Sequence, residues 1–128
     1  MKNIINIAVV GLGQVGIYLL NELKTKKKDI ELKTGKKINV VAVSARSITK
    51  KRRFNVDKKI FYKNPLEIFD KVKVDILFEV IGLSDGVSKK VVETALKNKI
   101  HVITPNKALI SKHGDYLSKL AEDNHVNL

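Results

Sequence analysis

The sequence predicts an α/β fold in which a doubly wound parallel sheet lies between two layers of helices (α/β/α). Three observations predict it. Strand-like apolar runs alternate with amphipathic helical stretches along the chain. The first run leads through a glycine-rich turn, residues 11–16, directly into a helix. The run at residues 38–43 is nearly continuous in apolar residues, which is typical of a parallel strand buried on both faces.

The first predicted strand spans residues 4–10, and the first helix starts near Gln14. Apolar residues at helical spacing define one face of this helix: Val15, Leu19, Leu20 and Leu23. We expect the helix to continue to Gly35, a residue suited to a helix end. Residues 38–43 form the second strand, and residues 46–59 are expected to form a basic surface loop.

Phe61 and Tyr62 are expected to form a short edge strand. Asn64 followed by Pro65 is typical of an N-cap and the first residue of a helix, so a short helix comes next. Residues 75–81 are the next buried strand.

Gly82 follows that strand immediately. Ser84 is expected to cap the helix after it, and residues 100–103 form another strand. A sharp turn at residues 104–107 then leads into a last helix, and residues 126–128 look like the opening of a further strand.

Composition is compatible with one domain of 128 residues and no membrane segment. The net charge is +12, but only three of the 25 basic residues are arginine, and few aromatics lie among the dispersed lysines. We therefore interpret the charge as solvated surface and expect no nucleic-acid partner. The chain has no cysteine, which excludes disulfides and thiolate metal sites and makes a cytoplasmic location the default.

The turn at residues 11–16 has the spacing of a dinucleotide-binding loop. Gly11 permits the tight turn, Gly13 lets the backbone approach a pyrophosphate, and Gly16 allows close helix packing. The pyrophosphate would face the positive end of the helix dipole. The other members of this predicted cofactor-binding loop are Leu12, Gln14 and Val15.

The residues after the second strand bear on the choice of cofactor. An NAD site commonly has an acidic residue there, whereas this chain has Ser44, Ala45 and Arg46, followed by Lys50, Lys51, Arg52 and Arg53. Arginine can bind a 2′-phosphate through charge-assisted hydrogen bonds. We therefore favour NADP, with NAD possible if Arg46 only ends the strand in solvent.

Five stretches together resemble one family. They are residues 11–16, 40–46, 78–82, 101–109 and 113–114. In this order they are similar to the NAD(P)-binding domain of homoserine dehydrogenase, and the threonine-proline-asparagine-lysine turn is the most specific of them. The resemblance implies a Rossmann-like fold.

The resemblance also implies an enzyme of the aspartate pathway, on the route to threonine, methionine and isoleucine. It interconverts aspartate-4-semialdehyde and homoserine by hydride transfer. Lys107 would be catalytic, beside the nicotinamide and the substrate, where its ammonium can stabilise developing alkoxide charge. Ile81, Gly82 and Thr104 would complete the cofactor site. Leu83 departs from the family, in which a second glycine is common.

His101 and His113 are interpreted as structural, at a strand start and a helix break, because neither has an evident catalytic partner in the sequence. No metal site is expected. The resemblance further implies that the family enzyme is a homo-oligomer. It also implies that the small-molecule substrate binds in a domain that follows the matched region.

We therefore expect the 128 residues to be the cofactor-binding part alone, ending inside a strand. Without the substrate domain the chain should be inactive and should expose a sheet edge. One alternative is an NAD(P)-sensing regulatory domain of an ion-transport system, which would have an acid after the second strand. Another is a different NADP-dependent oxidoreductase, with its catalytic lysine elsewhere.

Overall fold

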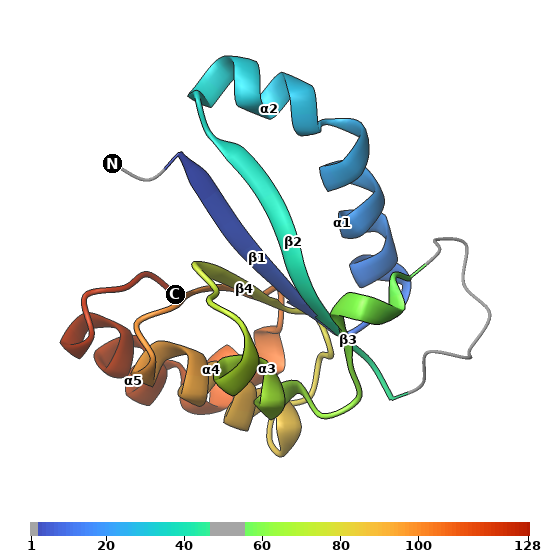
Figure 1. Cartoon of the computed structure of the whole chain (residues 1–128). Helices are drawn as coiled ribbons and strands as arrows, with labels where there is room; N and C mark the ends of the chain where they lie inside the picture. The colour runs from blue at the N-terminus through green and yellow to red at the C-terminus, as the bar shows by residue number, and fades with distance from the viewer. Residues whose placement is uncertain (1–2, 47–55) are drawn as a thin grey trace.

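The computed structural model describes residues 3–46 and 56–128. Its strands form one parallel sheet in the order β3-β2-β1-β4-β5 (Figure 1). The strands are β1 (Ile4–Val10), β2 (Lys37–Ser44), β3 (Phe61–Tyr62), β4 (Ile76–Glu79) and β5 (His101–Ile103). The chain runs outward from β1 to β3 and then returns to β4 on the other side of β1. The predicted doubly wound, Rossmann-like sheet is confirmed.

Helices cover both faces of the sheet (Figure 1). On one face are α1 (Gln14–Thr25) and α2 (Lys27–Thr34), and on the other are α3 (Ile68–Lys71), α4 (Val87–Lys97) and α5 (Lys107–Asp123). Two short 3-10 turns are η1 (Lys58–Ile60) and η2 (Pro65–Glu67). Within residues 3–46 and 56–128, no helix combines the length and apolar character needed to cross a bilayer.

The sheet separates two apolar clusters, and β1 contributes to both. Ile7 and Val9 pack with Leu20 of α1, whereas Ala8 and Val10 belong to the cluster that contains the buried faces of α4 and α5. Successive side chains of a strand point to opposite faces, so the part of β1 that is buried on both faces needs apolar residues at every position. This explains the apolar run at residues 7–10, whereas the polar residue of β1, Asn6, lies before it.

The first helix differs from its prediction. It ends at Thr25, where Lys26 has φ −101° and ψ 7°, and a separate helix, α2, follows. α2 buries none of its side chains, so packing does not hold it in line with α1. The expected continuous helix to Gly35 is therefore wrong, although Gly35 ends α2 in the left-handed conformation (φ 73°).

The start of α4 also differs. Ser84 does not cap it: Gly86 is the N-cap, and the Ser84 hydroxyl donates to Asp85 Oδ2 at 3.4 Å. Gly86 has φ 63°, which places the chain reversal two residues later than the sequence suggested. The predicted cap at Asn64 is confirmed, since its Oδ1 accepts from Leu66 N at 3.0 Å.

Residues 126–128 lie beside β5 without forming the predicted strand. Asn127 O accepts from Val102 N at 3.0 Å, but Asn127 N donates to the His101 ring (Nδ1) at 3.0 Å. The His101 side chain thus accepts the hydrogen bond that the Asn127 amide would donate to a neighbouring strand, and the segment is not paired as a strand.

Candidate functional site

The predicted site residues follow the carboxyl ends of neighbouring strands. Val10 of β1 pairs with Ser44 of β2 and with Glu79 of β4, and β5 pairs with β4 in parallel. The glycine turn, the exit of β2, the loop after β4 and the turn after β5 therefore lie at one edge of the sheet. This is the edge at which doubly wound sheets bind ligands.

The glycine turn is held in place by close backbone contacts. Gly11 has φ 109°, and its N–H donates to Ser44 O at 2.8 Å. A Cβ on Gly11 would lie 2.8 Å from the carbonyl carbon of Val80, so the segment after β4 packs directly on the turn. A Cβ on Gly16 would lie 1.9 Å from Gly11 O. Only glycine at these two positions allows α1 to start where it does.

The middle glycine of the turn, Gly13, faces open space. A Cβ on Gly13 would meet no atom of residues 3–46 or 56–128 within 4 Å, and its backbone is extended at φ −78°. Gly13 is the N-cap of α1, no side chain in the described part of the chain caps that helix, and its first turn holds no acidic residue. The positive end of the α1 dipole is thus open to a ligand beside Gly13, Gln14 and Val15, which are exposed. Leu12, by contrast, is buried in the core.

The exit of β2 divides into a buried and an exposed part. Ser44 is 1% exposed and contacts the glycine turn through its carbonyl oxygen, Ala45 is half-buried, and Arg46 is exposed. The basic residues predicted behind it, Lys50 to Arg53, lie outside the described residues.

The exit of β4 carries a buried carboxylate, Glu79. Its Oε2 accepts from the backbone N–H groups of Ile81 (2.9 Å) and Gly82 (3.0 Å). Its Oε1 accepts from Thr104 Oγ1 at 2.7 Å and from Asn106 Nδ2 at 3.1 Å. Predicted site residues from two different loops thus meet at one side chain.

The turn after β5 ends in an N-cap that places Lys107. Thr104 Oγ1 accepts from Asn106 N at 3.0 Å, and Asn106 Oδ1 accepts from Leu109 N at 3.0 Å. Lys107 is consequently the first residue of α5, and it is exposed at the ligand-binding edge of the sheet. The other predicted site residues of this region are Ile81, half-buried, and Gly82, exposed with φ 94°.

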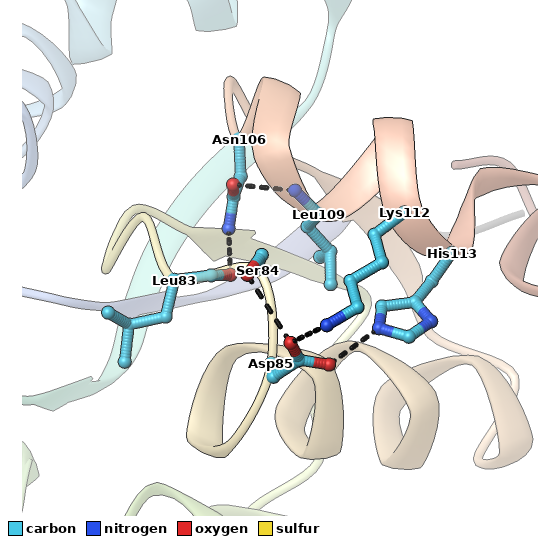
Figure 2. A network of polar contacts seen from close by, with 7 residues as sticks. All are labelled: Leu83, Ser84, Asp85, Asn106, Leu109, Lys112 and His113. Carbon is cyan, nitrogen blue, oxygen red and sulfur yellow. Dashed lines mark hydrogen bonds and ion pairs between the residues drawn. The ribbon is translucent and has the colours of Figure 1, made fainter.

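A second, more exposed set of contacts joins the loop before α4 to α5 (Figure 2). Leu83 O accepts from Asn106 Nδ2 at 2.7 Å, and its N–H donates to Ser88 Oγ at 3.1 Å. Asp85 contacts Lys112 and lies 2.7 Å from His113 Nε2. His113 lies inside the continuous helix α5, so its assignment to a helix break is wrong. It serves as a partner of Asp85.

Acidification should reveal the contribution of Asp85. Hydrogen bonds from Lys112 and His113 lower the pKa of Asp85 from 3.8 to about 2. A lowered pKa means that folding favours the ionised form, so Asp85 stabilises the fold above about pH 4 and loses this effect as the pH falls to about 2. Free energies of unfolding of the parent and Asp85→Asn should therefore differ at neutral pH and converge at about pH 2.

Asp115→Asn is the matched control, because Asp115 is an exposed carboxylate on α5, the helix that carries Lys112 and His113. If the free energy of unfolding differed from that of the parent by the same amount in both variants across the pH range, this role of Asp85 would be contradicted.

Sequence reasoning did not assign a role to Glu79, Asn106 or Asp85. Glu79 stood in an apolar strand, where an isolated acid is a signal of a buried polar site. Asn106 followed proline before a helical stretch, a pattern typical of an N-cap. The pairing of Asp85 with Lys112 and His113 left no local signal, since the partners are 27 and 28 residues away.

Comparison with known proteins agrees with this arrangement. A family model described as "Homoserine dehydrogenase, NAD binding domain" matches residues 11–128. The homoserine dehydrogenase of Neisseria gonorrhoeae is 31% identical over 95% of this chain and 28% of its own length. That of Bacillus subtilis is 28% identical over 97% of this chain and 28% of its own length. The S. aureus homoserine dehydrogenase crystal structure at pH 7.0 is 35% identical, with a TM-score of 0.89.

That S. aureus match covers 98% of this chain and 32% of the other. The chain therefore spans less than a third of the length of these three relatives. Because the family model covers nearly all of its residues, the chain belongs to the homoserine dehydrogenase family, in which it corresponds to the NAD-binding domain.

Proposed function

We propose that this chain binds NADP(H) as the cofactor domain of a homoserine dehydrogenase. The observation that carries the proposal is the contrast within the glycine turn. Gly11 and Gly16 have backbone where a side chain would be, whereas the space at Gly13 is open. A turn needed only to connect β1 to α1 would not require glycine at the open position. Close approach of a pyrophosphate to the backbone would explain the glycine at this position.

The residues at this edge fit both ends of the cofactor. The first turn of α1 offers backbone N–H groups and the positive end of the helix dipole to the pyrophosphate. Arg46, exposed after β2 with Ser44 and Ala45 before it, offers a guanidinium to an adenosine 2′-phosphate. Ile81, Gly82 and Thr104 follow β4 and β5, on the nicotinamide side of the switch point.

When bound, NADP(H) would supply a hydride to the carbonyl carbon of aspartate-4-semialdehyde, and would accept one from homoserine in the reverse direction. Lys107 is assigned the complementary task. Its ammonium, at the start of α5, polarises the aldehyde oxygen and stabilises the negative charge that develops there. The Asn106 cap and the Glu79 contact fix the backbone from which this side chain extends.

The groups that bind the amino-acid substrate are assigned to the part of the family enzyme that the chain does not span. We accordingly expect cofactor binding without turnover of homoserine by these residues alone. The membership in the homoserine dehydrogenase family favours this function over a transport-system regulatory domain.

Arg46→Asp tests the cofactor assignment. The parent chain should bind NADPH more tightly than NADH, by isothermal titration calorimetry or by quenching of cofactor fluorescence. The substitution removes a charge-assisted pair worth about 1.5–3 kcal/mol, so NADPH affinity should fall about ten- to a hundredfold. NADH affinity should change little, because NADH lacks the 2′-phosphate.

Lys73→Asp is the control for net charge, since it makes the same change in charge at an exposed residue before β4, at the opposite edge of the sheet. It should leave both affinities unchanged. Equal losses of NADPH and NADH binding in Arg46→Asp would refute the 2′-phosphate contact. Absence of any binding by the parent chain would refute the cofactor function itself.

A further inference from the structure

Glu79 is a buried acid for which the proposed chemistry provides no task. Its side chain is 0% exposed, and within residues 3–46 and 56–128 it is the only charged residue in the buried class. Burying a carboxylate costs several kcal/mol unless hydrogen bonds replace its water. An apolar residue at the end of β4 would avoid this cost, so the acid is not there for packing alone.

The hydrogen bonds of Glu79 are divided between two loops. One oxygen accepts from Ile81 N and Gly82 N, which follow β4, and the other accepts from Thr104 Oγ1 and Asn106 Nδ2, which follow β5. All four partners are donors, and an ionised carboxylate, which only accepts, is the side chain that can satisfy them together. Glu79 thus connects the two loops through one planar group.

Both loops belong to the candidate site. The segment after β4 packs on Gly11 of the glycine turn, where an added Cβ would lie 2.9 Å from Ile81 N. The other loop ends at the Asn106 cap, immediately before Lys107. The position of Lys107 relative to the glycine turn therefore depends on the Glu79 contacts.

We propose that Glu79 is a positioning residue whose buried carboxylate fixes the nicotinamide end of the site, by holding residues 81–82 and the turn before Lys107 in one arrangement. This inference rests on the proposed cofactor function. It predicts an effect limited to one end of the ligand, because the adenosine end is assigned to β2 and Arg46, whereas the described donors to Glu79 follow β4 and β5.

Glu79→Gln tests whether Glu79 positions the two loops through its hydrogen bonds or only fills space in the core. Glutamine has nearly the same volume as glutamate, but its NH₂ group would face the hydrogen-bond donors Thr104 Oγ1 and Asn106 Nδ2. The Thr104 hydroxyl can reverse and accept from it, whereas the Asn106 amide cannot, because its Oδ1 caps Leu109 N and its Nδ2 donates to Leu83 O. The turn before Lys107 should therefore shift while the core is retained.

The experiment compares whole cofactors with fragments that lack nicotinamide: NADPH with ADP-ribose 2′-phosphate, and NADH with ADP-ribose. Calorimetric affinities are measured for the 128-residue parent chain and for Glu79→Gln. Glu93→Gln on α4, a carboxylate that accepts from Tyr116 OH at 2.5 Å, is the matched control. Loss of one charge-assisted contact predicts about tenfold weaker binding of the cofactor, with fragment binding unchanged.

Equal weakening of cofactor and fragment in Glu79→Gln, or no weakening of either, would overturn the positioning role. Failure of the parent chain to bind either cofactor or either fragment would instead overturn the proposed function, and the positioning role with it. If Glu79→Gln does not fold, Asn106→Ser provides the same comparison, because it removes one donor to Glu79 from a residue outside the assigned cofactor contacts and keeps an oxygen that can cap α5. A selective loss of cofactor binding is again the supporting result.

Discussion

Gly16→Ala should both destabilise the fold and abolish tight cofactor binding. The new Cβ would lie 1.9 Å from Gly11 O and 3.0 Å from Gly11 C. Both are backbone atoms, so no side-chain rotation relieves the clash, and α1 or the turn must move. Overpacking of this kind costs about 1–3 kcal/mol, which urea unfolding would measure. Displacement of the α1 N-terminus from the pyrophosphate should weaken cofactor binding by more than tenfold.

Gly13→Ala is the control within the same turn. Its Cβ would enter open space, and its backbone at φ −78° suits alanine. Stability should fall by less than in Gly16→Ala, because alanine is a poorer N-cap residue than glycine but its Cβ meets no clash here. Cofactor affinity should nevertheless fall, since the methyl group occupies the path of the pyrophosphate. Full affinity in Gly13→Ala, or full stability in Gly16→Ala, would contradict these roles.

Asn106→Asp should be strongly destabilising despite its small change in shape. Asn106 is 6% exposed, and its Nδ2 donates to Glu79 Oε1 at 3.1 Å and to Leu83 O at 2.7 Å. Aspartate would turn an oxygen toward both acceptors and place a second carboxylate against Glu79. An uncompensated buried charge costs about 3–5 kcal/mol. Aspartate is as good an N-cap as asparagine, so loss of the α5 cap does not contribute.

Asn106→Ala is the comparison, because it removes the same donors and adds no charge. At neutral pH Asn106→Asp should be the less stable of the two by urea unfolding. Two adjacent carboxylates raise the pKa of the pair, so folding then favours the protonated form. The stability of Asn106→Asp relative to Asn106→Ala should therefore increase as the pH falls. A difference that is absent, or independent of pH, would show that the two side chains do not share a buried site.

Much of the fold could be predicted from local patterns. The strands β1, β2 and β4 are mostly apolar because helices cover both faces of the sheet, and that requirement is visible in the residues themselves. The caps were less predictable. Asn64 is an N-cap as its sequence suggests, but Ser84 is not, because Gly86 reverses the chain two residues later.

The candidate site was predictable to a similar degree. The glycine turn and the turn before Lys107 were recognised from residues adjacent in the chain.

The break between α1 and α2 could not be recognised in this way, because it depends on α2 burying none of its side chains. Whether a helix finds a surface to pack on is decided by the rest of the fold, and no local pattern reports it.

The sequence by itself determined the alternation of strands and helices, the glycine turn and the family to which the chain is similar. Each depends on short-range sterics or periodicity, which a few neighbouring residues specify. Only the tertiary structure decided that Glu79 joins two loops, since Thr104 and Asn106 are 25 and 27 residues away from it along the chain. A buried carboxylate needs several donors at once, and only the assembled edge of the sheet brings them together.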